Sequence, residues 1–151
     1  MLFGLGLMII KAYLCRKYNS KNPYHSILIL ILIINYCYSI MEELIQKIDA
    51  AINDGLLFKN PDLTIRDVAR ELATNRLYIS RAINTTYGYS FTVYLNRKRI
   101  EYSIALMAEH PMMLMENVAS ESGFVSETAF FRKFKQIMND SPRSYMKKIK
   151  P

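Results

Sequence analysis

Residues 122–136 of this 151-residue chain, "SGFVSETAFFRKFKQ", decide its fold. A small-residue pair and a serine precede a run with helical spacing, which is the pattern of a tight turn followed by a capped helix. Phe130 and Phe134 fall on one face of that helix. The other side carries an aromatic residue and two cations: Phe131, Arg132 and Lys135. A core helix needs only the apolar face, so this stretch alone leaves open whether the second face is merely solvated or binds a partner.

The same pattern occurs earlier in the chain. A shift of 50 residues places the Val-Ala pair at 68–69 on the pair at 118–119, and a shift of 51 places Arg81 on Arg132. The tight-turn positions also correspond: Ala73 and Gly123. The repeated unit is therefore a short helix, a turn and a longer capped helix. A helix-turn-helix places its second helix in the DNA major groove, and two copies in register are a stronger signal than one.

Helical patterns continue through the rest of the chain after residue 41, and we predict no strand there. They fall within the segments 41–55, 60–73, 75–87, 91–109, 114–124, 126–138 and 141–149. Good N-cap residues precede four of them: Thr64 (with Asp67 three residues on), Asn75, Ser126 and Ser141. A connecting helix of about 18 residues is ~27 Å long. With helix widths added, the two second helices could lie about 34 Å apart, one turn of DNA.

The chain resembles the DNA-binding domain of AraC/XylS-type transcription regulators over residues 56–148. Two runs carry the resemblance: "LTIRDVARELATNRLYISRAINTTYGYSFTVYLNRKRIEYSIALM" at 63–107 and "NVASESGFVSETAFFRKFKQIMNDSPRSYMKK" at 117–148. It implies an all-α, seven-helix domain of two helix-turn-helix subdomains joined by a long linker helix, here behind an apolar N-terminal segment. The chain departs from the family where glycine, phenylalanine and glycine are common: Ala73, Ile83 and Asn139. We expect no counterpart of the family's usual effector-binding or dimerisation domain within these 151 residues, so the input signal stays open.

The first recognition helix is expected at about 75–87. One face carries Arg76, Leu77, Ser80, Arg81 and Asn84, whereas Ile79, Ala82 and Ile83 are expected in the core. The family resemblance implies base-edge or phosphate contacts for Leu77, Ser80 and Arg81. An arginine can bond guanine O6 and N7 in a bidentate manner or pair with phosphate. The alternative is a solvated face without a partner.

The second recognition helix is expected at about 126–138. Its candidate DNA-contacting residues are Glu127, Thr128, Phe131, Arg132 and Lys135. Thr128 can bond a base or a phosphate, and Phe131 can pack on a thymine methyl group. Two alternatives stay open: Glu127 interacts only with the dipole of its own helix, or Phe131 packs on a neighbouring helix. We expect the cations of "NRKR" at 96–99 to be solvated and salt-bridged, and the tail at 143–151 to add phosphate contacts.

Residues 1–41 differ in composition from residues 42–151, so we place a domain boundary between them. They contain both cysteines, four cations, no acid and two apolar runs, each short of the ~20 residues that span a bilayer. Three interpretations stay open: the end of a membrane sensor, a non-native extension before Met41, or a buried element of a soluble protein. The cations at 16–21 should lie on the cytoplasmic side, which conflicts with two spans followed by a cytoplasmic domain.

Composition is consistent with a transcription regulator and offers little for catalysis. The net charge is +7, and we recognise no activated nucleophile and no glycine-rich phosphate loop. The two histidines, His25 and His110, lie far apart without Cys or carboxylate neighbours at ligand spacing. We therefore expect a protein that is not an enzyme and that needs no metal or other cofactor. The expected partner is double-stranded DNA in the cytoplasm, with RNA polymerase as a further partner of an activator. The alternative is a signalling fragment that residues 1–41 anchor to the membrane; the sequence leaves the oligomeric state open.

Overall fold

The computed structural model of this chain describes residues 23–54 and 56–149. The chain divides into two compact units, Met1–Glu43 and Leu44–Pro151. Helix α2 (Pro23–Asn53) continues through position 41, where composition alone placed the domain boundary. The "ILILILII" run lies within this helix and forms no strand, although its residue types also suit one. In the described part of the first unit, most of the apolar side chains are exposed, among them Ile27, Leu28, Leu30 and Ile31.

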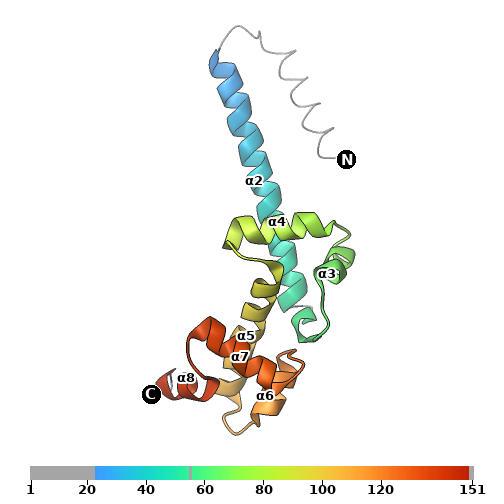
Figure 1. Cartoon of the computed structure of the whole chain (residues 1–151). Coiled ribbons are helices and arrows are strands. Elements are labelled where there is room, and N and C mark those ends of the chain that lie inside the picture. The colour runs from blue at the N-terminus through green and yellow to red at the C-terminus, as the bar shows by residue number, and fades with distance from the viewer. Residues whose placement is uncertain (1–22, 55, 150–151) are drawn as a thin grey trace. The chain divides into compact units, whose positions relative to one another are not determined.

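The second unit is built from helices arranged around one long helix. After the C-terminal part of α2 come η1 (Leu57–Lys59), α3 (Ile65–Glu71), α4 (Arg76–Tyr87), α5 (Phe91–Glu109), α6 (Met115–Glu121), α7 (Glu127–Met138) and α8 (Pro142–Ile149). Helix α5 contacts η1, α4, α6, α7 and α8, and connects the α3–α4 pair to the α6–α8 group (Figure 1). The described residues thus contain seven α-helices and no strand, which confirms the all-α prediction.

The internal repeat is present in the backbone. Ala73 and Gly123 occupy corresponding turn positions, and both have left-handed backbone, with φ of 47° and 77°. Asn139 also adopts this conformation at the end of α7, with φ of 54°, where the sequence suggested a glycine-like residue. Asparagine tolerates left-handed backbone better than most residues, whereas alanine at position 73 carries some strain.

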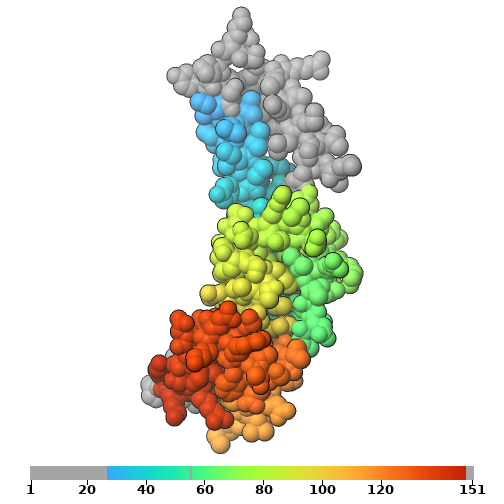
Figure 2. Space-filling model, in the orientation of Figure 1, coloured from blue at the N-terminus to red at the C-terminus, as the bar shows by residue number. Residues whose placement is uncertain are grey.

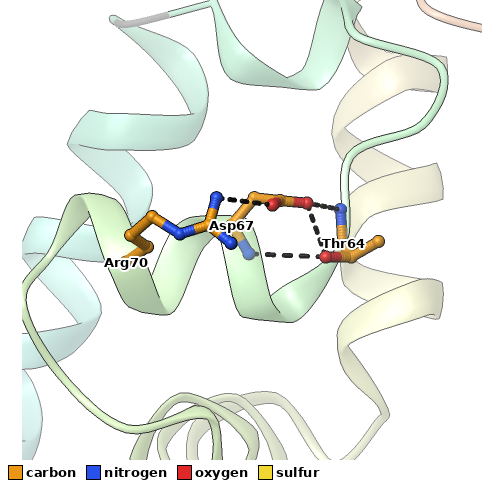
Figure 3. Close-up of polar contacts among 3 residues, drawn as sticks. All are labelled: Thr64, Asp67 and Arg70. Carbon is orange, nitrogen blue, oxygen red and sulfur yellow. Dashed lines mark hydrogen bonds and ion pairs between the residues drawn. The ribbon is translucent and has the colours of Figure 1, made fainter.

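The N-terminus of α3 is organised by the predicted capping box (Figure 3). The Thr64 amide donates to the Asp67 carboxylate at 2.9 Å, and the Asp67 amide donates to the Thr64 hydroxyl at 3.4 Å. Arg70 pairs with the same carboxylate at 3.2 Å. The hydrogen bonds from Thr64, together with Arg70, hold the pKa of Asp67 below its usual value. The exchange satisfies amides that a helix start otherwise leaves unpaired.

The core follows the predicted apolar faces. Ile48 and Ile52 of α2 are fully buried, as are Val68 and Ile79 of the first helix-turn-helix. A cluster in the second half joins the linker helix to both helices of the second helix-turn-helix: Ile100, Met107, Val118, Ala119, Phe124, Phe130 and Phe134. Each helix-turn-helix therefore packs its own apolar faces close to α5. Burial of this kind stabilises helices too short to persist alone.

A polar network that the sequence did not predict joins α2 to α4 and α5. The Asp49 carboxylate accepts hydrogen bonds from the hydroxyls of Tyr87, at 2.8 Å, and Tyr94, at 2.6 Å. Lys98 pairs with the same carboxylate at 3.0 Å. Burial alone would raise the pKa of Asp49, but the hydrogen bonds from both tyrosines and Lys98 lower it. Burial and the bond to Asp49 raise the pKa of Tyr87 to about 12.

The expectation that the cations at 97–99 are solvated and salt-bridged holds only in part: Lys98 pairs with Asp49, but Arg99 is buried. Arg97 is exposed and lies over the Tyr89 ring at 5.1 Å. Arg99 is only 7% exposed, and its guanidinium donates to the carbonyls of Phe58 and Asn60 instead of lying in solvent. The prediction was wrong for Arg99 because the acceptors come from a loop about 40 residues earlier in the chain.

Candidate nucleic-acid interface

Helix α4 presents its polar face to solvent because its apolar face is fixed in the core. The Asn75 side chain accepts from the Leu77 amide at 2.8 Å and caps the helix, as predicted. Ile79, Ala82 and Ile83 are fully buried, which confirms their predicted core positions. The candidate contact residues lie on the exposed remainder of the helix: Arg76, Leu77, Ser80, Arg81 and Asn84.

The two arginines of α4 are not used by the fold. Among the described residues, neither Arg76 nor Arg81 has a hydrogen-bond or ion-pair partner. Leu77 is 50% exposed, although it is a large apolar residue. An exposed leucine beside two unpaired guanidinium groups stabilises nothing visible within the domain. This is the combination that a helix needs to contact base edges and phosphates.

Helix α7 repeats this arrangement in the second half. The Ser126 hydroxyl accepts from the Ala129 amide at 3.2 Å, which confirms the predicted N-cap. Phe130 and Phe134 are fully buried and contact each other edge to face, with ring centroids 5.6 Å apart. Four of the five candidate residues are exposed: Glu127, Thr128, Arg132 and Lys135. In the described part of the chain, neither Arg132 nor Lys135 has an ion-pair partner.

Phe131 is the exception among the candidate residues. It is partly buried, contacts the Phe130 ring at 5.6 Å with an interplanar angle of 77°, and packs against the second core cluster. Packing within the domain is the alternative that the sequence left open for this residue. Phe131 is less exposed than the other four candidate residues of α7. The structure therefore gives Phe131 a role in the fold in addition to any contact with DNA.

The two exposed helices correspond position by position. Arg81 and Arg132 are each the sixth residue of their helix, and each helix starts directly after a side-chain N-cap. On the face shown in Figure 2, the surfaces of the two helix-turn-helix units lie at either end of the α5 residues. Among the described residues, no group of three or more His, Cys, Asp or Glu could hold a metal ion. The interface therefore offers hydrogen bonds, cations and apolar contacts to a partner.

Two capped and outward-facing helices, each preceded by a short helix and a tight turn, define a double helix-turn-helix protein. A family model described as a helix-turn-helix domain matches residues 68–148, more than half of the chain. Taken with the relatives described below, this match places the chain in the AraC/XylS-type family of helix-turn-helix transcription regulators. The resemblance seen in the sequence is thereby confirmed.

Curated relatives and solved structures agree with this placement. The chain is 35% identical over 80 residues to the TCP pilus virulence regulatory protein of Vibrio cholerae serotype O1, a match that covers 53% of this chain and 28% of that protein. It is 26% identical over 109 residues to Regulatory protein PocR of Salmonella typhimurium, covering 72% of this chain and 33% of that one. The C-terminal domain of AraT, a response regulator from Geobacillus stearothermophilus, aligns with a TM-score of 0.55 at 30% identity, covering 60% and 74% of the two chains. The chain thus spans at most a third of the length of these two curated relatives.

Proposed function

We propose that this protein is a sequence-specific, double-stranded DNA-binding transcription regulator of the cytoplasm that inserts α4 and α7 in successive major grooves. The observation that carries the proposal is the pair of exposed arginines, Arg81 and Arg132, which occupy the same position of two repeated helices and have no ion-pair partner among residues 23–54 and 56–149. A guanidinium in the major groove reads guanine by two parallel hydrogen bonds. Activation through contact with RNA polymerase extends this proposal and is the role that we favour over repression.

The DNA contacts proposed for the two helices differ in role: some read bases, and others bind phosphates. On α4 they are Arg76, Leu77, Ser80, Arg81 and Asn84, and on α7 they are Glu127, Thr128, Phe131, Arg132 and Lys135. We assign base reading chiefly to Arg81 and Arg132, and phosphate contacts to the other cations, because phosphate contacts position a protein whereas base contacts specify the sequence. Lys147 in the basic α8 adds a phosphate contact; Lys148 is paired with Asp140 at 2.8 Å.

Replacing either arginine should weaken binding to the selected DNA site. We expect Arg81→Ala and Arg132→Ala each to cost about 1–3 kcal/mol in binding free energy and to relax the base preference at one position. The measurement is a DNA selection with the 41–151 fragment, followed by gel shifts on selected and scrambled duplexes. Lys147→Gln is the matched control, because losing a phosphate contact should weaken both duplexes alike and reduce the slope of affinity against salt. Full affinity for the selected site in both arginine variants would contradict the assignment.

A second function, attachment to a membrane, is favoured by one observation. The helical segment Ile27–Asn53 is long and apolar enough to cross a bilayer by length and composition, and its apolar 18-residue window has a mean hydropathy of 1.8. The apolar residues at 27–34 follow one another without a polar side, and six of these eight residues are exposed, as expected of a helix surrounded by lipid. We expect the full chain to sediment with membranes and the 41–151 fragment to stay in the supernatant. Equal sedimentation of both chains would remove the anchor from the proposal.

A further inference from the structure

Arg99 holds the loop at residues 57–63, which contains η1 and precedes the first helix-turn-helix, against the linker helix α5. Its Nε donates to the Phe58 carbonyl at 2.8 Å, and one terminal nitrogen donates to the Asn60 carbonyl at 2.7 Å. The side chain is only 7% exposed, and burial lowers the pKa of Arg99. A buried guanidinium is costly to desolvate, but its planar set of donors fixes several acceptors in one geometry. The loop is thus held by a rigid group of α5.

The same loop lies directly against the turn of the second helix-turn-helix. A Cβ atom built on Gly123 would overlap the Phe58 carbonyl oxygen and come within 2.9 Å of the Lys59 Cα. Only a glycine permits this approach of two backbone segments. The Arg99 guanidinium also lies 5.8 Å from the centre of the Phe124 ring. One carbonyl oxygen therefore contacts both the linker helix and the second turn.

A second contact follows at the edge of this junction. Lys59 forms an ion pair with Glu121 of α6 at 3.5 Å, and its ammonium lies 4.7 Å from the Tyr102 ring centre. The loop leads into α3 and so into the first helix-turn-helix, whereas Gly123 belongs to the turn that leads into α7. The two helix-turn-helix units are consequently joined to each other at this point, in addition to their separate packing on α5.

We propose that Arg99 and Gly123 are positioning residues, which set the separation and rotation of α4 relative to α7 and thereby the half-site spacing that the protein accepts. The inference rests on the proposed function, because spacing matters only when both helices enter DNA. One inserted base pair moves a half-site by ~3.4 Å and turns it by ~35° about the DNA axis. A hinged linker would follow such a shift, whereas a locked junction would not.

The first test needs no DNA. Spin labels are placed on exposed positions of the two helices, Thr86→Cys and Gln136→Cys, with Cys15 and Cys37 replaced by serine, and the distance distribution is measured by electron-electron double resonance. Wild-type residue 99 should give one narrow distribution, and Arg99→Met, which keeps an apolar stem, should broaden it. Glu121→Lys opposes two cations at the exposed edge of the junction and leaves Arg99 intact. Glu121→Lys should also broaden the distance distribution. If Arg99→Met does not fold, this variant alone tests whether the junction fixes the distance between the two helices.

The second test uses selected DNA with both half-sites. An added or removed base pair should lower wild-type affinity by about tenfold or more, as a lost specific contact does. Arg99→Met should bind the best spacing more weakly, change by less than about threefold across the series and bind a single half-site as the wild type does. A narrow distribution and a steep spacing profile in the variants would overturn the inference. If DNA selection with the wild-type protein yielded no bound sequence while Arg99→Met still broadened the distance distribution, the proposed function would be wrong. The role of Arg99 in fixing the two helices relative to each other would still be supported.

Discussion

Replacing Gly123 by alanine is expected to lower the free energy of unfolding of residues 44–151 by about 2–5 kcal/mol. Its φ of 77° is unfavourable for any residue with a Cβ, at a cost of about 1–2 kcal/mol. The added Cβ would also meet backbone atoms of Phe58 and Lys59, which cannot rotate away as a side-chain end would. Urea unfolding followed by circular dichroism measures the loss.

Gly88 provides a matched control for this prediction. Its φ of 76° is nearly the same, but a Cβ built there meets no atom within 4 Å. Gly88→Ala should therefore cost only the conformational part, about 1–2 kcal/mol. Equal losses for the two variants would show that the loop at Phe58 moves freely away from Gly123, and would remove the close approach as a cause.

Replacing Asp49 by asparagine should also lower the free energy of unfolding substantially. Three groups depend on this carboxylate: the hydroxyls of Tyr87 and Tyr94, and the Lys98 ammonium. Tyr94 is only 1% exposed, so its hydroxyl has no access to bulk water if the bond is lost. We expect Asp49→Asn to lower the free energy of unfolding by about 1–3 kcal/mol at pH 7. Asp54→Asn, an exposed neighbour beyond the end of α2, should change it by less than about 0.5 kcal/mol.

The Asp49 effect should also depend on pH in a defined direction. The pKa of Asp49 in the folded protein lies below its unfolded value of 3.8. Its stabilisation is therefore present above that value and is lost as the pH falls through the folded pKa. The difference between wild type and Asp49→Asn should shrink as the pH is lowered below about 4. Unfolding curves at several pH values measure it; a constant difference would mean that the charge of Asp49 contributes nothing.

Local patterns predicted most of the secondary structure and the exposed faces of α4 and α7. The side-chain caps at Asn75 and Ser126 depend on residues within one helix turn, and so does the left-handed backbone at Asn139. The burial of Ile79 and Phe130 follows from helical spacing, because an amphipathic helix has only one apolar side to bury. The positions of α4 and α7 and their exposed faces could therefore be predicted before any tertiary contact was known.

Contacts between segments that lie far apart in the chain could not be predicted from local sequence patterns. Asp49 bonds to residues 38 and 45 positions away, and no local pattern distinguishes it from the exposed Asp54. Phe131 occupies the cationic side of its helix by spacing, yet it packs partly against the core beside Phe130. In both cases a neighbouring element, absent from any short stretch of sequence, decides what the side chain contacts.

The sequence by itself determined that this chain contains two copies of a capped, outward-facing helix joined by a long helix, because caps and periodicity act over a few residues. Only the tertiary structure decided how the two copies are held together. Besides the packing of both copies on α5, the contacts between them involve the buried guanidinium of Arg99 and the approach of Gly123 to the backbone at Phe58. A run of cations such as "NRKR" cannot indicate which member is buried, since the acceptors arrive from a loop that folding alone brings near.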